Sequence, residues 1–377
     1  MAALERDFPA PTLSLLNREG ELAPTPEAEQ FLPIIAALSD AELEQFYRDM
    51  VRSRRIDTMG ANLQRQGQLA LWIPSQGQEA AQVGSGRAAR AQDHLFPAYR
   101  EHTVGMIRGL DPVNLFSLLR GLTLGGWNPA ENGNFHLYTL VLASQTLHAT
   151  GYAMGMRLDG KVGTGDPESD AAVLVYYGDG STSQGDASEA LVFASSYQTP
   201  QVFFVQNNQW AISVPVSRQS RTPLSRRALG FGMPGIQIDG NDVLVSYAVT
   251  RTALDEARAG VGPSLIEALT YRMGAHTTAD DPTKYRTNDE VEYWTARDPI
   301  VRYRTWLASR GASAAFFDEV DAEASDLVSD VRKRALAVAA PSRDAMFKHV
   351  YSDPHPLMTE QYAWLDQFER SLDGDVA

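Results

Sequence analysis

Two polar residues, Asp179 and Asn208, each follow an apolar segment of the chain. Asp179 follows the run 171–177 after Gly178, and Asn208 comes soon after the run 202–205. Both runs are apolar at consecutive positions, which is typical of central strands in a parallel sheet covered on both faces. Residues 186–196, between the runs, have helical spacing. The segment therefore predicts strand, helix, strand, with Asp179 and Asn208 at one edge of the sheet, where such folds bind ligands.

One carboxylate and one amide are too few ligands to hold a divalent cation alone. They suit Mg²⁺, which accepts one or two protein oxygens and takes the others from phosphate and water. Gly178 and Gly180 permit close backbone approach, and free amides of the turn and the helix start can bind phosphate oxygens. The pattern predicts a site for a Mg²⁺-bound phosphate compound. The alternative is an ordinary glycine-rich turn in a sheet enzyme.

Composition excludes several classes of function. The 377 residues suffice for one α/β domain with additional helices. The net charge of −14 argues against binding to nucleic acid or anionic membranes. The absence of cysteine excludes disulfides and thiolate metal sites. No basic segment precedes an apolar N-terminal core, and no apolar run approaches 18 residues. We therefore expect a cytoplasmic protein.

The expected architecture is α/β, with a central, mostly parallel sheet flanked by helices. Residues 1–35 contain several prolines and little periodicity, so we expect an irregular arm packed on the domain or on a partner. Residues 36–350 form the expected α/β domain, with helices in its C-terminal part, and residues 351–377 form a tail. Ser39 and Glu42 make a capping box, which predicts that a helix begins just after Ser39.

The Gly178-Asp179-Gly180 turn, followed after residues 181–206 by Asn207-Asn208, resembles the thiamin diphosphate and Mg²⁺ motif. The surrounding segments, GDGSTSQGDASEAL and NNQWAIS, resemble the alpha subunit of the decarboxylating component of 2-oxo acid dehydrogenase complexes. The resemblance runs from about residue 30 to residue 350. It implies the thiamin diphosphate-binding fold, thiamin diphosphate and Mg²⁺ as cofactors, and Asp179, Asn208 and the Trp210 carbonyl as metal ligands.

The resemblance also implies the other cofactor contacts. Tyr99 and Arg100 lie in a Tyr-Arg-Glu segment, where the guanidinium can pair with two phosphate oxygens. Ile212 matches a bulky aliphatic residue beside the cofactor rings. Gln206 replaces an arginine of some relatives, which removes one positive contact. The predicted cofactor contacts are Tyr99, Arg100, Leu140, Leu142, Gly178, Asp179, Gly180, Ser181, Asn208, Ile212 and His276.

Residues 121–142 depart from the family pattern. The family usually has a Gly-Arg-Gln-Met-Pro-x-His run and a Ser-Pro-hydrophobic turn here, and this chain has neither. Residues 140–142 take the place of the turn, where their backbone groups can still serve the pyrimidine ring of the cofactor. His136 does not align with the family histidine. His148 lies in a helical segment and is expected to be a core histidine.

His276 follows another predicted strand and lies in a polar loop. A histidine just beyond the carboxyl end of a strand is a candidate for chemistry. The resemblance implies that it is catalytic or orients the substrate. Arg272, Tyr285 and Arg286 are expected to order this loop.

The resemblance implies decarboxylation of a 2-oxo acid and transfer of the acyl group to a lipoyl group on a dihydrolipoyl acyltransferase. In the family, a glutamate that assists the cofactor comes from a separate beta chain. The sequence offers no substitute, so we expect an alpha2-beta2 enzyme.

The loop 276–286 looks more like the branched-chain members, and an apolar wall would favour branched acids. We expect Phe135, Leu140, Val141 and Leu142 to contribute to that wall. Three alternatives remain: a pyruvate or acetoin dehydrogenase alpha subunit, a non-catalytic alpha-like interaction subunit, and a Mg²⁺-dependent phosphate-transfer enzyme. The last lacks a P-loop.

Overall fold

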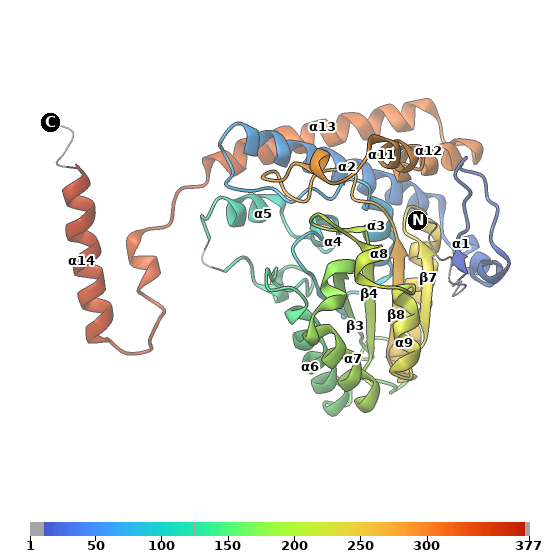
Figure 1. The fold of residues 1–377 in the computed structure, drawn as a ribbon, viewed down its shortest axis with the longest axis horizontal. Coiled ribbons are helices and arrows are strands. Elements are labelled where there is room, and N and C mark those ends of the chain that lie inside the picture. Colours follow the sequence, from blue (N-terminus) through green and yellow to red (C-terminus); the bar gives the residue numbers. More distant parts are fainter. Residues whose placement is uncertain (1–10, 124, 374–377) are drawn as a thin grey trace.

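The computed structural model describes residues 11–123 and 125–373 and contains a six-stranded parallel sheet (Figure 1). The strand order is β1-β7-β8-β4-β3-β2, and every neighbouring pair is parallel. The strands are β1 (Thr12–Leu13), β2 (His94–Phe96), β3 (Val173–Gly178), β4 (Gln201–Asn207), β7 (Gly235–Asp239) and β8 (Ser264–Leu269). A separate antiparallel pair consists of β5 (Trp210–Ala211) and β6 (Val214–Pro215). The predicted α/β class is confirmed.

Helices make up most of the remainder. The α-helices are α1 (Leu32–Ala36), α2 (Asp40–Arg65), α3 (Glu79–Ala88), α4 (His102–Ile107), α5 (Pro112–Leu119), α6 (Ser144–Leu158), α7 (Gly185–Tyr197), α8 (Val216–Gln219), α9 (Arg227–Gly230), α10 (Val243–Arg258), α11 (Asn288–Thr295), α12 (Pro299–Ser309), α13 (Ala314–Ala337) and α14 (Pro356–Asp373). Short 3-10 turns are η1 (Pro26–Phe31), η2 (Pro129–Glu131), η3 (Asp179–Ser183), η4 (Leu224–Arg226), η5 (Pro282–Lys284) and η6 (Arg343–Met346).

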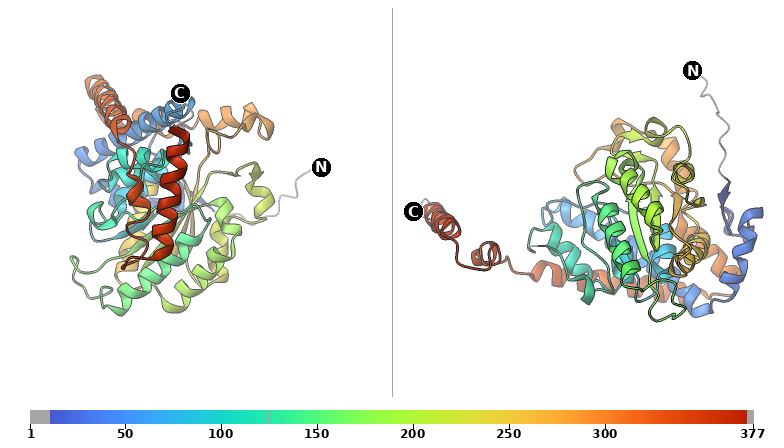
Figure 2. Two further views of the ribbon diagram at one scale, coloured as in Figure 1. Left: turned by 90° about the vertical axis from the view of Figure 1, so that its left-hand side faces the viewer. Right: turned by 90° about the horizontal axis from the view of Figure 1, so that it is seen from below.

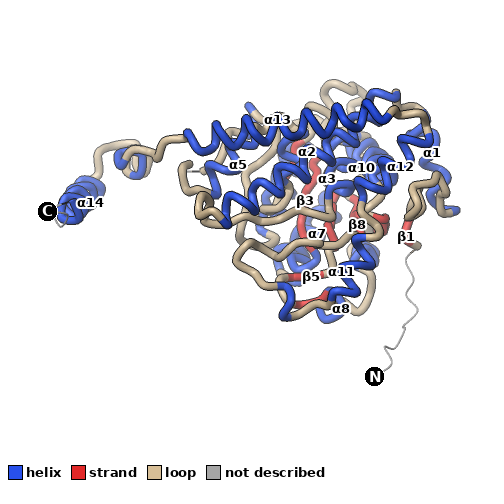
Figure 3. The backbone as a smooth tube through the Cα atoms, turned by 90° about the horizontal axis from the view of Figure 1, so that it is seen from above, coloured by secondary structure: helices blue, strands red, loops and turns tan. Residues whose placement is uncertain are grey.

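Helices cover both faces of the sheet, which explains why its central strands are apolar at consecutive positions. Along β3, Leu174 and Tyr176 belong to the core that includes α2, α3 and α10. Val173 and Val175 belong to the core formed with α6 and α7. Figure 3 shows α2 and α13 running side by side, and the ion pair between Arg48 and Glu323 (2.7 Å) joins them. The sheet is therefore a rigid scaffold for the loops at its edges.

The N-terminal segment packs on its own domain from residue 11 onward. Strand β1 adds to the sheet edge beside β7. The Asp242 carboxylate, at the N-terminus of α10, accepts hydrogen bonds from the Leu15 and Leu16 amides, both at 2.7 Å. Residues 1–10 of the predicted arm lie outside the described residues. Helix α2 begins at the predicted place, because the Ser39 hydroxyl accepts from the Glu42 amide and the Glu42 carboxylate accepts from the Ser39 amide.

The C-terminal segment leaves the body after α13, which ends at Ala337. Helix α14 stands away from the body (Figures 1 and 2) and packs against the segment around η6, where Arg343 pairs with Asp366 at 2.6 Å. Trp364 and Phe368 on this helix are 63% and 47% exposed. Within residues 11–123 and 125–373, no helix is long and apolar enough to cross a membrane.

Candidate active site

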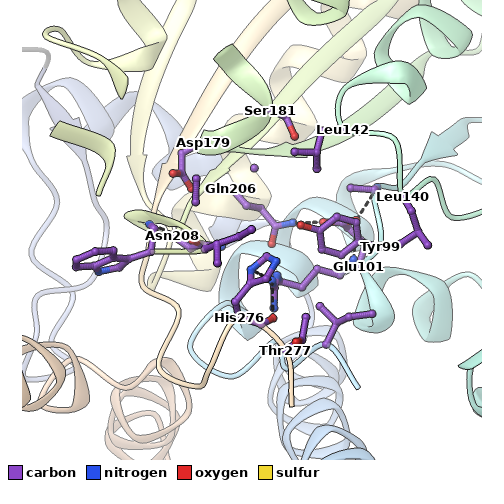
Figure 4. Close-up of a pocket in the computed structure, with 18 of the residues that line it drawn as sticks. Tyr99, Glu101, Leu140, Leu142, Asp179, Ser181, Gln206, Asn208, His276 and Thr277 are labelled. Carbon is purple, nitrogen blue, oxygen red and sulfur yellow. Dashed lines mark hydrogen bonds between the residues drawn. The ribbon is translucent and has the colours of Figure 1, made fainter. Parts of the chain in front are cut away.

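The loops after four adjacent strands, β2, β3, β4 and β8, meet at the carboxyl edge of the sheet around a cavity of ≈ 480 Å³. This volume is within the usual range for small-molecule sites. Figure 4 shows Asp179 and Ser181 across the cavity from His276 and Thr277. Every predicted site residue lines this cavity: Tyr99, Arg100, Leu140, Leu142, Gly178, Asp179, Gly180, Ser181, Asn208, Trp210, Ile212 and His276.

Asp179 is the acidic group at the end of β3. Its side chain is only 1% exposed, and burial raises the pKa of the carboxyl to about 6. The Gln219 side-chain amide donates to Oδ2 at 2.9 Å, and this bond and the backbone N–H of Asn208 lower the pKa in part. Asp179 forms no ion pair within 4 Å with any basic side chain in the described part of the chain. A bound cation would therefore stabilise the charged form.

Asn208 and Trp210 lie next to it at the end of β4. The Asn208 side-chain amide donates to Gln78 Oε1 at 3.3 Å, and Asn208 Oδ1 accepts from the Trp210 amide at 3.3 Å. The Trp210 carbonyl already accepts a hydrogen bond from Arg272 at 3.1 Å. A carbonyl oxygen has two lone pairs, so one remains for a metal ion.

The two glycines of the turn matter because they lack a side chain, and not because they adopt unusual backbone angles. Neither has a positive φ. A Cβ on Gly180 would lie 2.7 Å from the Ala211 Cβ, so only glycine allows this contact between the β3 and β4 loops. A Cβ on Gly178 would meet no atom within 4 Å, which leaves open space at the cavity wall. The positive φ values in this region belong instead to Gln209 (+73°) and Ile212 (+54°), and the latter is an unfavourable conformation for a β-branched residue.

Two buried arginines place positive charge at the cavity: Arg100 lines it, and Arg272 bonds to three of its lining residues, Trp210, Ile212 and His276. Arg100 donates to the carbonyls of Pro74 and His276, and Arg272 donates to those of Trp210 and Ile212. Neither guanidinium has a carboxylate within 4 Å among the described residues. Arg100 and its sequence neighbour Glu101 therefore form no ion pair. Burial and the neighbouring Arg100 lower the pKa of Arg272 to about 10. The site is suited to an anion.

His276 is held between these arginines. Its Nδ1 lies 3.3 Å from a nitrogen of Arg100 and 3.3 Å from a nitrogen of Arg272. Burial, with the two positive charges, lowers the pKa of the imidazole to about 3. Both partners are donors, so Nδ1 accepts and the neutral ring carries its proton on Nε2. His276 can therefore donate a hydrogen bond to a ligand in the cavity.

A hydrogen-bonded network orders the loop that carries His276. Asp280 accepts from the His276 amide (2.8 Å) and from the Tyr285 hydroxyl, which in turn accepts from Arg272 at 2.7 Å. Arg286 donates to the carbonyls of Arg272, Met273 and Gly274. The expected ordering role of Arg272, Tyr285 and Arg286 is confirmed by these contacts.

Several cavity residues were not predicted from the sequence. Gln78 is fully buried and lines the cavity, and its Nε2 has no partner among the described residues, so this donor is available to a ligand. Gln206, which the resemblance had already placed at the cofactor site, donates to the unpredicted Glu101, whose pKa is raised by burial, and accepts from Gln82 at 3.2 Å. The remaining unpredicted wall consists of Leu71, Ile73, Ala98, Gln184, Ala211 and Thr277. Buried glutamines and apolar residues carry no distinctive sequence signal.

Two expectations about the apolar wall were wrong. Phe135 is fully buried in the main core, stacked beside Trp127 (5.7 Å), because its backbone forms a bridge with Leu95 next to the sheet. Val141 is 70% exposed and does not line the cavity. Leu71 and Ile73, which precede α3, supply the wall together with Leu140 and Leu142.

The structure also places two other histidines outside the cavity. His136 stacks on Phe96 at 3.7 Å, and its Nε2 lies 3.1 Å from Nδ1 of His94. His148 is exposed on α6, so the expectation of a core histidine was wrong. It lies on the outer face of the helix.

The buried imidazole of His102, behind the cavity, should make the stability of the fold sensitive to acid. Its Nε2 bonds to the Ile73 carbonyl at 2.9 Å, its Nδ1 to the Tyr138 hydroxyl at 2.7 Å, and burial lowers its pKa to about 4. The unfolded chain binds this proton near pH 6.5 and the native chain only near pH 4, so stability falls as pH drops through this window. The free energy of unfolding, measured with urea, should fall between pH 7 and pH 5. This fall should be about 2 kcal/mol smaller in His102→Gln than in the wild type. His148→Gln is the exposed control and should leave the difference unchanged.

Comparisons with known proteins agree with the site. Residues 47–342 match the family described as dehydrogenase E1 component. The chain is 46% identical over 327 residues to the 3-methyl-2-oxobutanoate dehydrogenase subunit alpha of Mycobacterium tuberculosis, which covers 86% of each chain. It is 37% identical over 362 residues to the pyruvate dehydrogenase E1 component subunit alpha of Bacillus cereus (95% of this chain, 91% of that protein). The corresponding Staphylococcus aureus N315 subunit is 36% identical over 332 residues, 87% of each chain.

Proposed function

Because the chain belongs to the dehydrogenase E1 component family, we propose that it is the alpha subunit of a branched-chain 2-oxo acid dehydrogenase that uses thiamin diphosphate and Mg²⁺. The observation that carries the proposal is the convergence of all twelve predicted site residues on one cavity at the ends of four parallel strands. The M. tuberculosis relative, at 46% identity, favours a branched-chain acid over pyruvate.

The residues of the cavity fit a diphosphate with its metal. Arg100 and Arg272 supply positive charge with no carboxylate partner among the described residues, and Gln78 Nε2 supplies an unpaired donor. Asp179 and Asn208 supply the carboxylate and amide oxygens for Mg²⁺. When bound, thiamin diphosphate supplies the carbon nucleophile and the electron sink for decarboxylation.

The residues of this chain orient the substrate by a hydrogen bond and by apolar contacts. His276, as the neutral Nε2–H form, donates a hydrogen bond to the substrate oxygen or the acyl group. Leu71, Ile73 and Leu142 surround the aliphatic side chain of the acid and exclude water. Ile212, held at a positive φ by the bond from Arg272 to its carbonyl, presents its side chain to the cofactor rings.

An open cavity supports assembly with other chains. Three residues that line the cavity, Leu140, Leu142 and Ile212, are 74%, 38% and 54% exposed. Apolar residues around a site are usually covered in the working enzyme. The beta subunit of an alpha2-beta2 enzyme covers them and brings the glutamate that this chain lacks, and the lipoyl-bearing dihydrolipoyl acyltransferase accepts the acyl group. The bare face of α14, with Trp364 and Phe368, is also available for subunit contact.

Reconstitution tests this proposal. The purified chain with thiamin diphosphate and Mg²⁺ should not decarboxylate 2-oxo acids above background, because the site is incomplete. Addition of the beta chain of the same component should produce decarboxylation, followed with an artificial electron acceptor. Turnover by the alpha chain alone would contradict the need for a partner. Cofactor binding by the mixture without decarboxylation of any 2-oxo acid would identify a non-catalytic subunit.

Arg100 should contribute to affinity through its charge. In the assembled enzyme, Arg100→Met should weaken thiamin diphosphate binding by about tenfold to a hundredfold, because a hydrogen bond to a charged group contributes about 1.5–3 kcal/mol. The loss should shrink as salt rises. Arg108→Met is a matched control, since Arg108 donates to carbonyls, those of Gly133, Arg90, Ala91 and Asp93, and does not line the cavity. Calorimetry that finds equal affinity for the two variants would contradict the role of Arg100.

A further inference from the structure

The loop that carries Leu71 and Ile73 is fixed to helix α2 by one buried carboxylate. Asp57, on α2, is 5% exposed. Its Oδ1 accepts from the Trp72 indole N–H at 2.8 Å and from the Ser75 amide at 3.0 Å, and its Oδ2 accepts from the Gln76 amide at 3.1 Å. Asp57 thus binds three donors within five residues of one loop and does not line the cavity.

The shape of α2 adds to this attachment. Gly60 lies one turn after Asp57, and a Cβ at this position would lie 2.2 Å from the Trp72 ring. The indole therefore lies flat against the backbone of α2. Its other contacts are stacked rings, Phe116 at 4.9 Å and His102 at 4.7 Å between centroids. These contacts hold the Trp72 ring in the position from which its N–H reaches Asp57.

The same loop bonds to the elements of the active site on its other side. The Pro74 carbonyl accepts from Arg100, and the Ile73 carbonyl bonds to His102. The Trp72 backbone exchanges hydrogen bonds with Thr278, two residues after His276, at 3.0 Å in both directions. The position of the loop relative to α2 therefore sets the position of its apolar side chains relative to the reacting groups.

We propose that Asp57 is a positioning residue for substrate selection: it fixes the loop 71–76 so that Leu71 and Ile73 form the wall that contacts the aliphatic side chain of the 2-oxo acid. This inference rests on the proposed function of the cavity. An isosteric Asp57→Asn change brings an amide N–H₂ group against backbone donors, so it must release at least one of the three bonds. The wall then moves, while Asp179, Asn208 and the sheet keep their places.

The test compares Asp57→Asn with wild type in the assembled alpha-beta enzyme. The ratio of kcat/KM for 3-methyl-2-oxobutanoate to that for pyruvate should fall by about fivefold or more, because pyruvate has no branched side chain to lose contacts. The loss should reside mainly in KM for the branched acid, since the wall contacts ground state and transition state alike. Hydrogen exchange at the Ser75 and Gln76 amides should be faster, which is a readout independent of turnover.

Controls separate positioning from stability. Asp49→Asn is matched, because Asp49 is also a buried carboxylate on α2 but bonds to Arg87 and Gln45 instead of the loop. It should leave the substrate ratio unchanged. If Asp57→Asn does not fold, Trp72→Phe keeps an aromatic ring at this position and removes the N–H together with the five-membered part of the indole, and the ratio should still fall.

Two results overturn the inference. One is an unchanged substrate ratio with equal losses for both acids, which would assign Asp57 a purely structural role. The other is unchanged hydrogen exchange of the loop. Failure of the proposed function is a different observation: wild-type enzyme that neither binds thiamin diphosphate nor decarboxylates either acid.

Discussion

Replacement of Asp179 with alanine is expected to abolish Mg²⁺-dependent binding of thiamin diphosphate. Asp179 is the carboxylate of the predicted metal site, and removing one partner of a buried charge pair costs about 2–5 kcal/mol, or about 30-fold or more in affinity. The fold should survive, because the buried carboxyl has a pKa of about 6 without a metal, which means that its charge is costly in the empty protein. Calorimetry on the assembled enzyme measures the affinity, and thermal unfolding measures the stability.

Asp186→Ala provides the control for this experiment. Asp186 lies in the first turn of α7, close to Asp179 in the sequence, but does not line the cavity. It should bind the cofactor as the wild type does. Undiminished affinity in Asp179→Ala would remove the proposed metal site.

Replacement of His276 with alanine is expected to lower kcat by about 10² or more, the usual cost of lost acid-base or hydrogen-bonding help. The imidazole is neutral with its proton on Nε2, so it acts on a ligand in the cavity and not as a counter-charge for phosphate. Thiamin diphosphate affinity should change much less than turnover. If His276→Ala instead lowers the affinity for thiamin diphosphate and keeps full turnover at saturating cofactor, His276 binds the cofactor and does not act on the substrate.

The pH profile gives a second check on His276. Its pKa of about 3 lies below the working range, so wild-type turnover should not show a step from this group between pH 5 and pH 8. Thr277→Ala serves as a neighbouring control, because Thr277 lines the cavity without a bond to either arginine.

The residues with a distinctive type and spacing were predictable. Asp179 and Asn208 each follow a run that is apolar at every position. Such runs form central strands because helices cover both faces of the sheet. The capping box of Ser39 and Glu42 predicted the start of α2, because it satisfies local donors whatever the tertiary structure.

The other half of the site could not be predicted, because it depends on tertiary contacts between distant segments. Leu71 and Ile73 have ordinary apolar types, and the loop that carries them is held by hydrogen bonds to distant residues such as Asp57, Arg100 and Thr278. Phe135 was wrongly assigned to the wall, because proximity in the sequence to Leu140 said nothing about its bridge to Leu95. Gln78 has no local signal at all, and its importance rests on an unpaired N–H₂ in a buried place.

The most direct test of the account is a side-by-side measurement of kcat/KM for 3-methyl-2-oxobutanoate and pyruvate. The enzyme is the alpha chain assembled with its beta partner, with thiamin diphosphate and Mg²⁺ present. We expect the branched acid to be preferred by about one to two orders of magnitude, because each methylene in an apolar wall is worth about 1–3 kcal/mol. A value for pyruvate equal to or above that for the branched acid would contradict it.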